Sequence, residues 1–281
     1  MRINKPLFSL KDFYNDCISH YRDKNKHEIM NAILPKLEKD ENRYKYSLKN
    51  KTLHLEKNNQ LHGVDKNDLI NLYERKFLNP KLNARSYYDR IKTATNICPY
   101  CGKRHTKTVD HFLSKSNYPN FSITPINLVP CCSDCNTSKK DKDADISDIS
   151  NLLFHPYEES LAEFKWLKAK INIIDDKIYF NYYVCKDIID DITYMRLENQ
   201  FTMLELDKFY DLEANVEFSR SIETYRELYS APDGKTLLMD HFKFELRKYS
   251  KFDFKVNYYM YVYYESLIEN FNDLTLIFSS I

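Results

Sequence analysis

The sequence predicts an α+β fold that is mostly helical, with a small cysteine-rich module near the middle of the chain. Apolar residues recur at helical spacing before residue 95 and after residue 187. Between these regions, residues 98–142 hold five of the seven cysteines among many turn-forming residues. We therefore expect a helical region over 1–95, a stapled module over 96–150, and a hairpin with a helical bundle over 151–281.

The N-terminal region should consist of short helices joined by polar loops. Ser9 can cap a first helix and Asp65 a later one, since both side chains accept hydrogen bonds from backbone amides. Pro35 should start a new turn or kink the helix around it. The polar stretch 40–64 predicts a loop or a weak hairpin. The expected helices thus follow Ser9, cover about 27–39, follow Asp65, and run over 85–95.

The C-terminal region begins with an acidic polar linker over 141–150. Apolar and polar residues then alternate over 164–174 and 177–184, which predicts a β-hairpin that turns at Asp175 and Asp176. Helical spacing returns afterwards. It predicts helices over 188–206, 210–228, 237–249 and 256–268, and the tyrosine-rich stretch 258–264 should pack as core or interface.

The composition excludes several classes of protein. Only three glycines are present, so the chain has no glycine-rich phosphate-binding loop. No apolar run approaches the ~20 residues that a membrane helix needs. The first residues contain no long apolar segment of the kind that directs secretion, so we expect a cytoplasmic protein without a membrane partner.

The net charge of +1 conceals two halves of opposite sign. Residues 1–142 carry 27 basic and 15 acidic side chains, a net of +12, and residues 143–281 carry a net of −11. A basic half favours a polyanionic partner, although two solvated faces of opposite sign would give the same totals. The acidic, aromatic-rich half is expected to contact protein and to repel a phosphate backbone.

The cysteines are spaced as in a zinc site. Cys98 with Cys101, and Cys132 with Cys135, form two CxxC pairs 30 residues apart. Zn²⁺ prefers four thiolates in a tetrahedron, and each tight CxxC turn supplies two of them. Cys131 would offer an alternative CxxxC spacing. Such a closed site is structural, so its interest lies in the residues that it holds.

The segments CPYCG (98–102), VDHFLSKS (109–116) and PINLVPCCSDCNTSKKD (125–141) resemble the HNH endonucleases of the ββα-metal class, in their form with a four-cysteine zinc site. The resemblance implies a metal-dependent nuclease that hydrolyses phosphodiester bonds in DNA or RNA. His111 has the right chemistry for the general base. Asp110 and Asn136 offer the oxygen ligands that Mg²⁺ or Mn²⁺ prefers. Asn136 stands where the family name has its final histidine.

The resemblance also assigns supporting roles inside the module. Asn127 corresponds to the middle asparagine, whose amide is expected to tie the loop and orient His111, although a turn asparagine is the simpler interpretation. Lys139, Lys140 and Lys115 are placed to meet a substrate phosphate, or are merely solvated. Two alternatives stay open: a nuclease specific for RNA such as tRNA, and a zinc module that binds nucleic acid without cutting it.

The flanks carry a further resemblance. RSYYDRI (85–91) and LFHPY (153–157) are similar to the nuclease subunit of the Septu anti-phage system and to its retron-associated relatives. This implies an effector nuclease of a bacterial defence complex. It also implies an ABC-type ATPase subunit, or another defence-complex partner, bound through residues 150–281.

Overall fold

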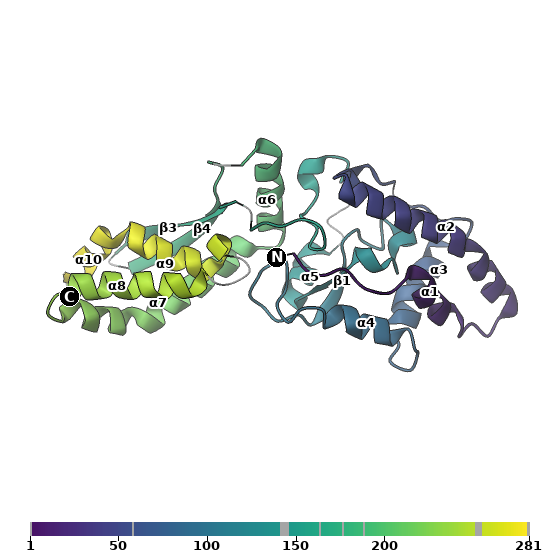
Figure 1. Ribbon diagram of the computed structural model, residues 1–281, viewed down its shortest axis with the longest axis horizontal. Helices are drawn as coiled ribbons and strands as arrows, with labels where there is room; N and C mark the ends of the chain where they lie inside the picture. Colours follow the sequence, from purple (N-terminus) through teal and green to yellow (C-terminus); the bar gives the residue numbers. More distant parts are fainter. Residues whose placement is uncertain are drawn as a thin grey trace. The chain divides into compact units, whose positions relative to one another are not determined.

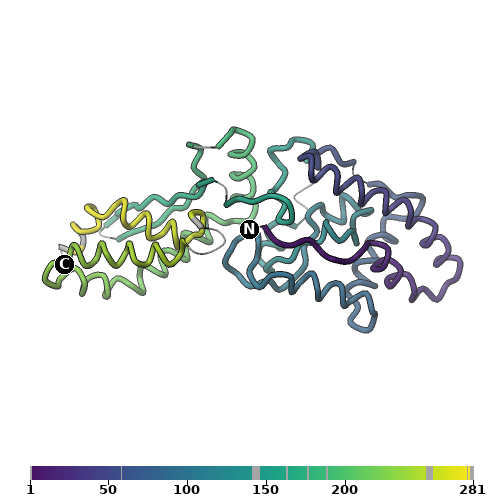
Figure 2. Tube along the Cα trace, in the orientation of Figure 1, coloured from purple at the N-terminus to yellow at the C-terminus, as the bar shows by residue number. Residues whose placement is uncertain are grey.

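The chain folds into two compact units, Arg2–Ser160 and Leu161–Ile281 (Figures 1 and 2). The fold is mostly helical with two small antiparallel hairpins, which confirms the predicted α+β class. No helix among the described residues is long and apolar enough to cross a membrane. The computed structural model describes residues 2–57, 59–140, 146–162, 164–175, 177–187, 189–250 and 255–279.

Helices form most of the first unit outside the cysteine-rich module. Ser9 caps the first helix as predicted, since its hydroxyl accepts a hydrogen bond from the amide of Asp12 at 3.1 Å. Asp65 occupies the N-cap position of the third. A π-helix follows that third helix directly. The elements are α1 (Leu10–Ile18), α2 (Lys24–Lys49), α3 (Lys66–Asn71), the π-helix (Leu72–Phe77) and α4 (Arg85–Lys92).

Helix α2 is longer than predicted. It continues through Pro35 and ends at Lys49, so the loop or hairpin predicted over 40–64 is wrong for its first ten residues. Asp40 and Tyr44 continue the buried face of the helix beyond Leu37. Because this buried face contains polar side chains that are paired in the fold, apolar spacing alone does not detect it. A short 3-10 turn (Leu53–Leu55) follows the helix.

The N-terminal helices and the module share one hydrophobic core. Phe13 of α1 packs on Phe77 of the π-helix with ring centroids 4.4 Å apart. Val109 and Leu128, which lie on the two strands of the module, belong to the same buried cluster. The module is therefore built onto the helices and is not a separate body.

The module itself is a β-hairpin followed by a helix. Strand β1 (Thr108–His111) pairs antiparallel with β2 (Leu128–Cys131), with Asp110 opposite Val129. Two 3-10 turns (Pro119–Phe121 and Pro125–Asn127) lie in the loop between the strands. Helix α5 (Ser133–Lys139) begins directly after β2. Of the acidic linker predicted next, Asp141–Asp145 lie outside the described residues, and the remainder contains a 3-10 turn (Ile149–Asn151).

The second unit packs a β-hairpin on helices. Strands β3 (Leu167–Ile174) and β4 (Lys177–Val184) pair antiparallel with Ile174 opposite Lys177, which confirms the predicted hairpin with a later start of its first strand. Asp176 of the predicted turn lies outside the described residues. The predicted helices are confirmed with shifted ends, Ile188 of the first lying outside the described residues, and α10 was not predicted. The helices are α6 (Asp191–Met203), α7 (Leu206–Ser230), α8 (Gly234–Tyr249), α9 (Tyr259–Glu269) and α10 (Phe271–Ser279).

Candidate functional site

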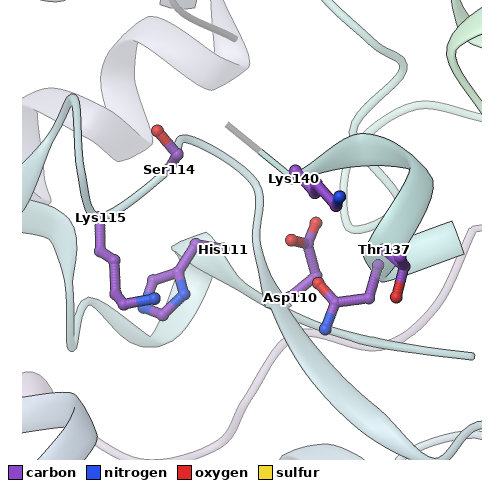
Figure 3. A pocket seen from close by; sticks show the side chains of 7 residues that line it. Asp110, His111, Ser114, Lys115, Thr137 and Lys140 are labelled. Carbon is purple, nitrogen blue, oxygen red and sulfur yellow. The ribbon is translucent and has the colours of Figure 1, made fainter. Parts of the chain in front are cut away.

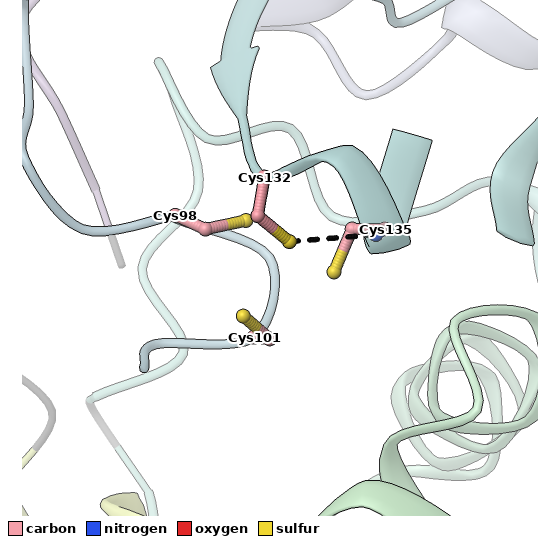
Figure 4. A group of neighbouring side chains, drawn as sticks. All are labelled: Cys98, Cys101, Cys132 and Cys135. Atoms are coloured by element: carbon pink, nitrogen blue, oxygen red, sulfur yellow. Dashed lines mark hydrogen bonds between the residues drawn. The ribbon is translucent and has the colours of Figure 1, made fainter. Parts of the chain in front are cut away.

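Four cysteines of the module lie close together (Figure 4). Cys98 and Cys101 come from the loop before β1, and Cys132 and Cys135 come from the start of α5. All four are buried, and their sulfur atoms lie within 4.8 Å of one another. A tetrahedral Zn²⁺ with bonds of about 2.3 Å needs sulfur atoms about 3.8 Å apart. The four cysteines are therefore positioned to bind a zinc ion.

Local hydrogen bonds shape the second cysteine pair. Cys132 is the N-cap of α5, and its sulfur accepts a hydrogen bond from the amide of Cys135 at 3.4 Å. Hydrogen bonds from the neighbouring thiols, first that of Cys101, lower the pKa of Cys132 and so favour a thiolate. Cys131 belongs to β2 and is not a member of the cluster, so the CxxC spacing describes the geometry and the CxxxC alternative does not.

A pocket of about 330 Å³ opens on the other side of β1 and α5. Figure 3 shows His111 and Lys115 on one side of it, and Asp110, Thr137 and Lys140 on the other. Its lining is rich in charged and hydrogen-bonding groups and contains no large apolar side chain. The lining residues are Asp110, His111, Ser114, Lys115, Asn136, Thr137 and Lys140.

His111 is held as a neutral imidazole at the end of β1. Its Nε2 lies 2.8 Å from the carbonyl oxygen of Ser122, and a carbonyl can only accept, so Nε2 carries the proton. Nδ1 is then the basic nitrogen. Burial lowers the pKa of His111 from 6.5 to about 3, and the charges of Lys115 and Lys139 act in the same direction. The imidazole therefore stays unprotonated near neutral pH.

Tyr73, a residue of the π-helix, packs against the ring of His111. The ring of Tyr73 meets it edge-on, with centroids 4.3 Å apart. The Tyr73 hydroxyl donates to the carbonyl oxygen of Val109 in β1 at 3.2 Å. The i to i+5 bond from the Leu78 amide to the Tyr73 carbonyl, at 2.9 Å, forms the wide turn that bears this side chain. Sequence reasoning missed Tyr73, because its only signal was an apolar position on a helix.

Asp110 is almost fully buried and is held by two donors. The Tyr100 hydroxyl donates to its Oδ2 at 3.0 Å. The ammonium of Lys139 lies 3.3 Å from the same oxygen and donates to the carbonyl oxygen of His111 at 2.7 Å. Lys139 is only 1% exposed and does not line the pocket, unlike Lys115 and Lys140. Outside the cysteine cluster, the pocket is lined by the proposed site residues Asp110, His111, Lys115, Asn136 and Lys140, whereas Lys139 and Asn127 do not line it.

Asn136 faces the pocket from the first turn of α5. Its Nδ2 lies 3.4 Å from the hydroxyl of Thr108, which leaves the amide oxygen as its ligand atom. Lys140 ends the helix with a positive φ of 42°. On the opposite wall, the ammonium of Lys115 lies 3.6 Å from the Glu74 carboxylate.

Asn127 cross-links the loop that contains Ser122, the hydrogen-bond partner of His111. Its Nδ2 donates to the carbonyl oxygens of Leu113 at 2.9 Å and Phe121 at 3.1 Å, and its Oδ1 accepts from the Leu113 amide at 2.8 Å. The Tyr44 hydroxyl, from α2, also donates to that oxygen at 3.0 Å. Ser122 directly follows Phe121, so these bonds fix the carbonyl that orients His111.

Residues of the two flanking motifs pack against the module and against the core that it shares with the helices. His155 is fully buried, and its Nε2 lies 3.3 Å from the Tyr44 hydroxyl. The Tyr157 hydroxyl donates to the carbonyl oxygen of Leu128 in β2 at 2.7 Å. In the other flank, the guanidinium of Arg85 stacks on the ring of Tyr88, and Tyr88 packs on the core. Both motifs are scaffold in this structure.

Hairpin β1–β2 and helix α5 form a ββα module that lies next to a charged pocket and to four cysteines positioned to bind zinc. Comparison with known proteins agrees, because residues 98–142 match the HNH endonuclease family, with positions 141 and 142 outside the described residues. The chain thus contains an HNH endonuclease domain. It is also similar to protein ea31 of Escherichia phage lambda, with 37% identity over 111 residues. That match spans 38% of this chain and 37% of the phage protein. No solved structure matches the chain at a significant level.

Proposed function

We propose that this protein is a metal-dependent endonuclease that hydrolyses phosphodiester bonds in nucleic acid. The observation that carries the proposal is the position of His111, whose Nε2 is hydrogen-bonded to the Ser122 carbonyl and which lines a pocket together with two lysines. An imidazole whose second nitrogen can accept a proton, next to cations that can bind phosphate, supplies the groups that hydrolysis needs.

In the proposed reaction His111 takes a proton from a water molecule through Nδ1. The water oxygen forms a new bond to phosphorus while the bond between phosphorus and the leaving 3′ oxygen breaks. Lys115 and Lys140 hold the phosphate oxygens from opposite walls of the pocket. Tyr73 and the Ser122 carbonyl keep the imidazole in one orientation throughout.

Asp110 and Asn136 would hold the catalytic Mg²⁺ or Mn²⁺. Both offer oxygen atoms to the pocket, and oxygen is the ligand that these hard cations prefer. When bound, the ion would stabilise the negative charge that develops on the leaving oxygen. Lys139 pairs with the buried Asp110 carboxylate and holds it in place, so it acts as a positioning residue and the phosphate contacts fall to Lys115 and Lys140.

Cleavage of supercoiled plasmid and of a structured RNA, each titrated with Mg²⁺ and Mn²⁺, tests the proposal. The His111→Ala variant should lose two to four orders of magnitude of activity, roughly the contribution of a general base, with its zinc content unchanged. His20→Ala, which removes an exposed histidine of the same unit, is the matched control. Cleavage by His111→Ala at the wild-type rate would exclude this residue as the base. If the wild type cuts neither nucleic acid, the non-catalytic zinc module becomes the better interpretation.

The role in anti-phage defence and the ATPase subunit are proposals supported by the resemblance of the flanks alone. The same cleavage assay on plasmid and on structured RNA tests whether the substrate is DNA or RNA. Co-purification of the full chain with the product of a neighbouring gene tests for the partner.

A further inference from the structure

The hairpin of the second unit presents a continuous outward face. In an antiparallel pair, directly opposite residues point to the same side of the sheet. The register therefore places four pairs on one face: Lys168 with Tyr183, Lys170 with Asn181, Asn172 with Tyr179, and Ile174 with Lys177. We call these eight residues the outer hairpin face. Each strand contributes four of them over about 20 Å.

The opposite face of the hairpin is covered by helices. The rings of Phe180 and Tyr263 of α9 lie with centroids 4.9 Å apart, and Phe180 also packs on Phe218 of α7 at 5.8 Å. The Tyr182 hydroxyl donates to the carbonyl oxygen of Tyr259 at 2.8 Å. The covered face therefore explains the alternating buried residues of β4. The exposed tyrosines of the outer hairpin face have no such explanation.

The outer hairpin face combines cations with exposed aromatic rings. Tyr179 and Tyr183 are 41% and 44% exposed, whereas Tyr182 on the covered face is only 4% exposed. The two strands contain three lysines and no carboxylate, within a half of the chain whose net charge is −11. Lys168 is in an ion pair with Asp187 at 3.2 Å, so Lys170 and Lys177 are the stronger candidates for an anionic ligand.

A cleft of about 450 Å³ continues this face between the start of β4 and α7. Lys177 and Tyr179 belong to both, while Phe218 and Ile222 form the apolar wall. Arg226 also lines the cleft. Its Nη1 donates to Glu223 at 2.7 Å, so Arg226, like Lys168, is already paired with a carboxylate.

We propose that the outer hairpin face and its cleft bind single-stranded nucleic acid. Tyr179 would stack on an unpaired base at the mouth of the cleft, with Lys177 close to the adjoining phosphate. Bases in a duplex are already stacked on one another, so exposed tyrosines favour a single strand. The proposal rests on the proposed function only in taking nucleic acid as the substrate, because binding at this face needs neither His111 nor a divalent ion.

Net charge alone argued for a protein partner in this half of the chain. Net charge describes this half as a whole, while a polyanion responds to local potential within about 10 Å at ordinary ionic strength. Neither strand contains an acidic residue, but Asp187 pairs with Lys168 and Asp211 accepts a hydrogen bond from Asn181, so the attraction for a polyanion rests on Lys170 and Lys177. A protein partner is therefore an alternative occupant of the same face, and the test below distinguishes the two.

The test is fluorescence anisotropy with the full-length His111→Ala chain, without divalent ion, on labelled single-stranded DNA and RNA and on a duplex. Tyr179→Ala should weaken single-strand binding roughly tenfold, within the range measured for loss of one stacked base. Lys177→Gln should lower the slope of log affinity against log salt by about 0.7. Duplex binding should change little. Tyr46→Ala, an exposed tyrosine of the first unit, and Lys243→Gln, an exposed lysine of α8, are the matched controls.

Single-strand affinity that is unchanged in both hairpin variants overturns the proposal, as does the absence of single-strand binding in the parent chain. Release of a co-purifying protein by Tyr179→Ala, with oligonucleotide binding intact, would assign the face to a protein partner and also overturn it. Cleavage by the wild type with Mg²⁺ is measured separately, so failure of the nuclease proposal is distinguished from failure of this one.

Discussion

Acidification should weaken the first unit through His111, and the His111→Asn variant should lack this part of the loss. The imidazole is neutral and buried in the fold, where its pKa is about 3, while an exposed histidine has a pKa near 6.5. Between these two values the unfolded chain binds a proton that the folded chain does not. Stability from this group is therefore complete above pH 6.5 and is lost as the pH falls toward 3.

The size of the effect follows from the two pKa values. Between pH 7 and pH 5 the linkage relation gives a loss of about 2 kcal/mol in the free energy of unfolding for the wild type. The zinc thiolates also become protonated in acid, but they are present in both proteins. The difference between wild type and His111→Asn therefore isolates the histidine.

Two measurements without divalent ion check this. Histidine-selective NMR should show a His111 imidazole that stays neutral at pH 5, and urea unfolding, followed by amide exchange in β1 and β2, should show the difference of about 2 kcal/mol. A His111 resonance that titrates near pH 6.5 would refute the reasoning, and so would equal acid losses in the two proteins. A neutral His111 also means that cleavage should show no acid limb near pH 6.5 arising from this residue.

Substitutions at three further residues test other parts of the site. Cys98→Ser should lower the zinc content below one per chain and destabilise the fold, because structural zinc binding contributes folding free energy; full zinc content in the variant would contradict the four-cysteine site. Asn136→Ala should move the Mg²⁺ activation curve to higher concentration, and an unchanged curve would show that Asn136 is not a ligand. Tyr73→Leu should lower kcat by roughly tenfold to a hundredfold with little change in KM, because the imidazole loses its fixed orientation. Tyr73→Phe keeps the ring and should retain more activity than Tyr73→Leu, and equal losses would assign the effect to the hydroxyl.

A site or element was predictable from the sequence where the residues that form it lie close together along the chain. The CxxC turns supply two sulfur atoms each, so their cluster needs only that one turn meets the other. Hairpin β3–β4 was equally accessible, because alternation over both strands is read directly from the residues. The buried face of α2 was less predictable, since the partners of Asp40 and Tyr44 include Asn120 and Asn127, which lie far away along the chain.

Neighbouring lysines illustrate the same limit. Lys139 and Lys140 are adjacent residues of the same type, so the sequence does not distinguish their roles. In a helix, however, successive side chains point about 100° apart. This turns Lys139 inward onto Asp110 and leaves Lys140 at the pocket, where the helix has ended. The role of Tyr73 is similarly hidden, because it depends on a π-turn and on a strand that lies 36 residues away.

The supports of Asn127 have a consequence for how this HNH domain can be exchanged between proteins. The stretch that matches the family, residues 98–142, contains neither Tyr44 nor Tyr157, which bind the loop and β2 from outside it. Grafting that stretch alone into another chain would carry over the reactive groups and leave behind the walls that orient them. The pocket and its supports thus belong together in the whole Arg2–Ser160 unit, and recombination that breaks it after α2 but before Cys98 should yield a fragment that keeps the four cysteines and lacks the Tyr44 support.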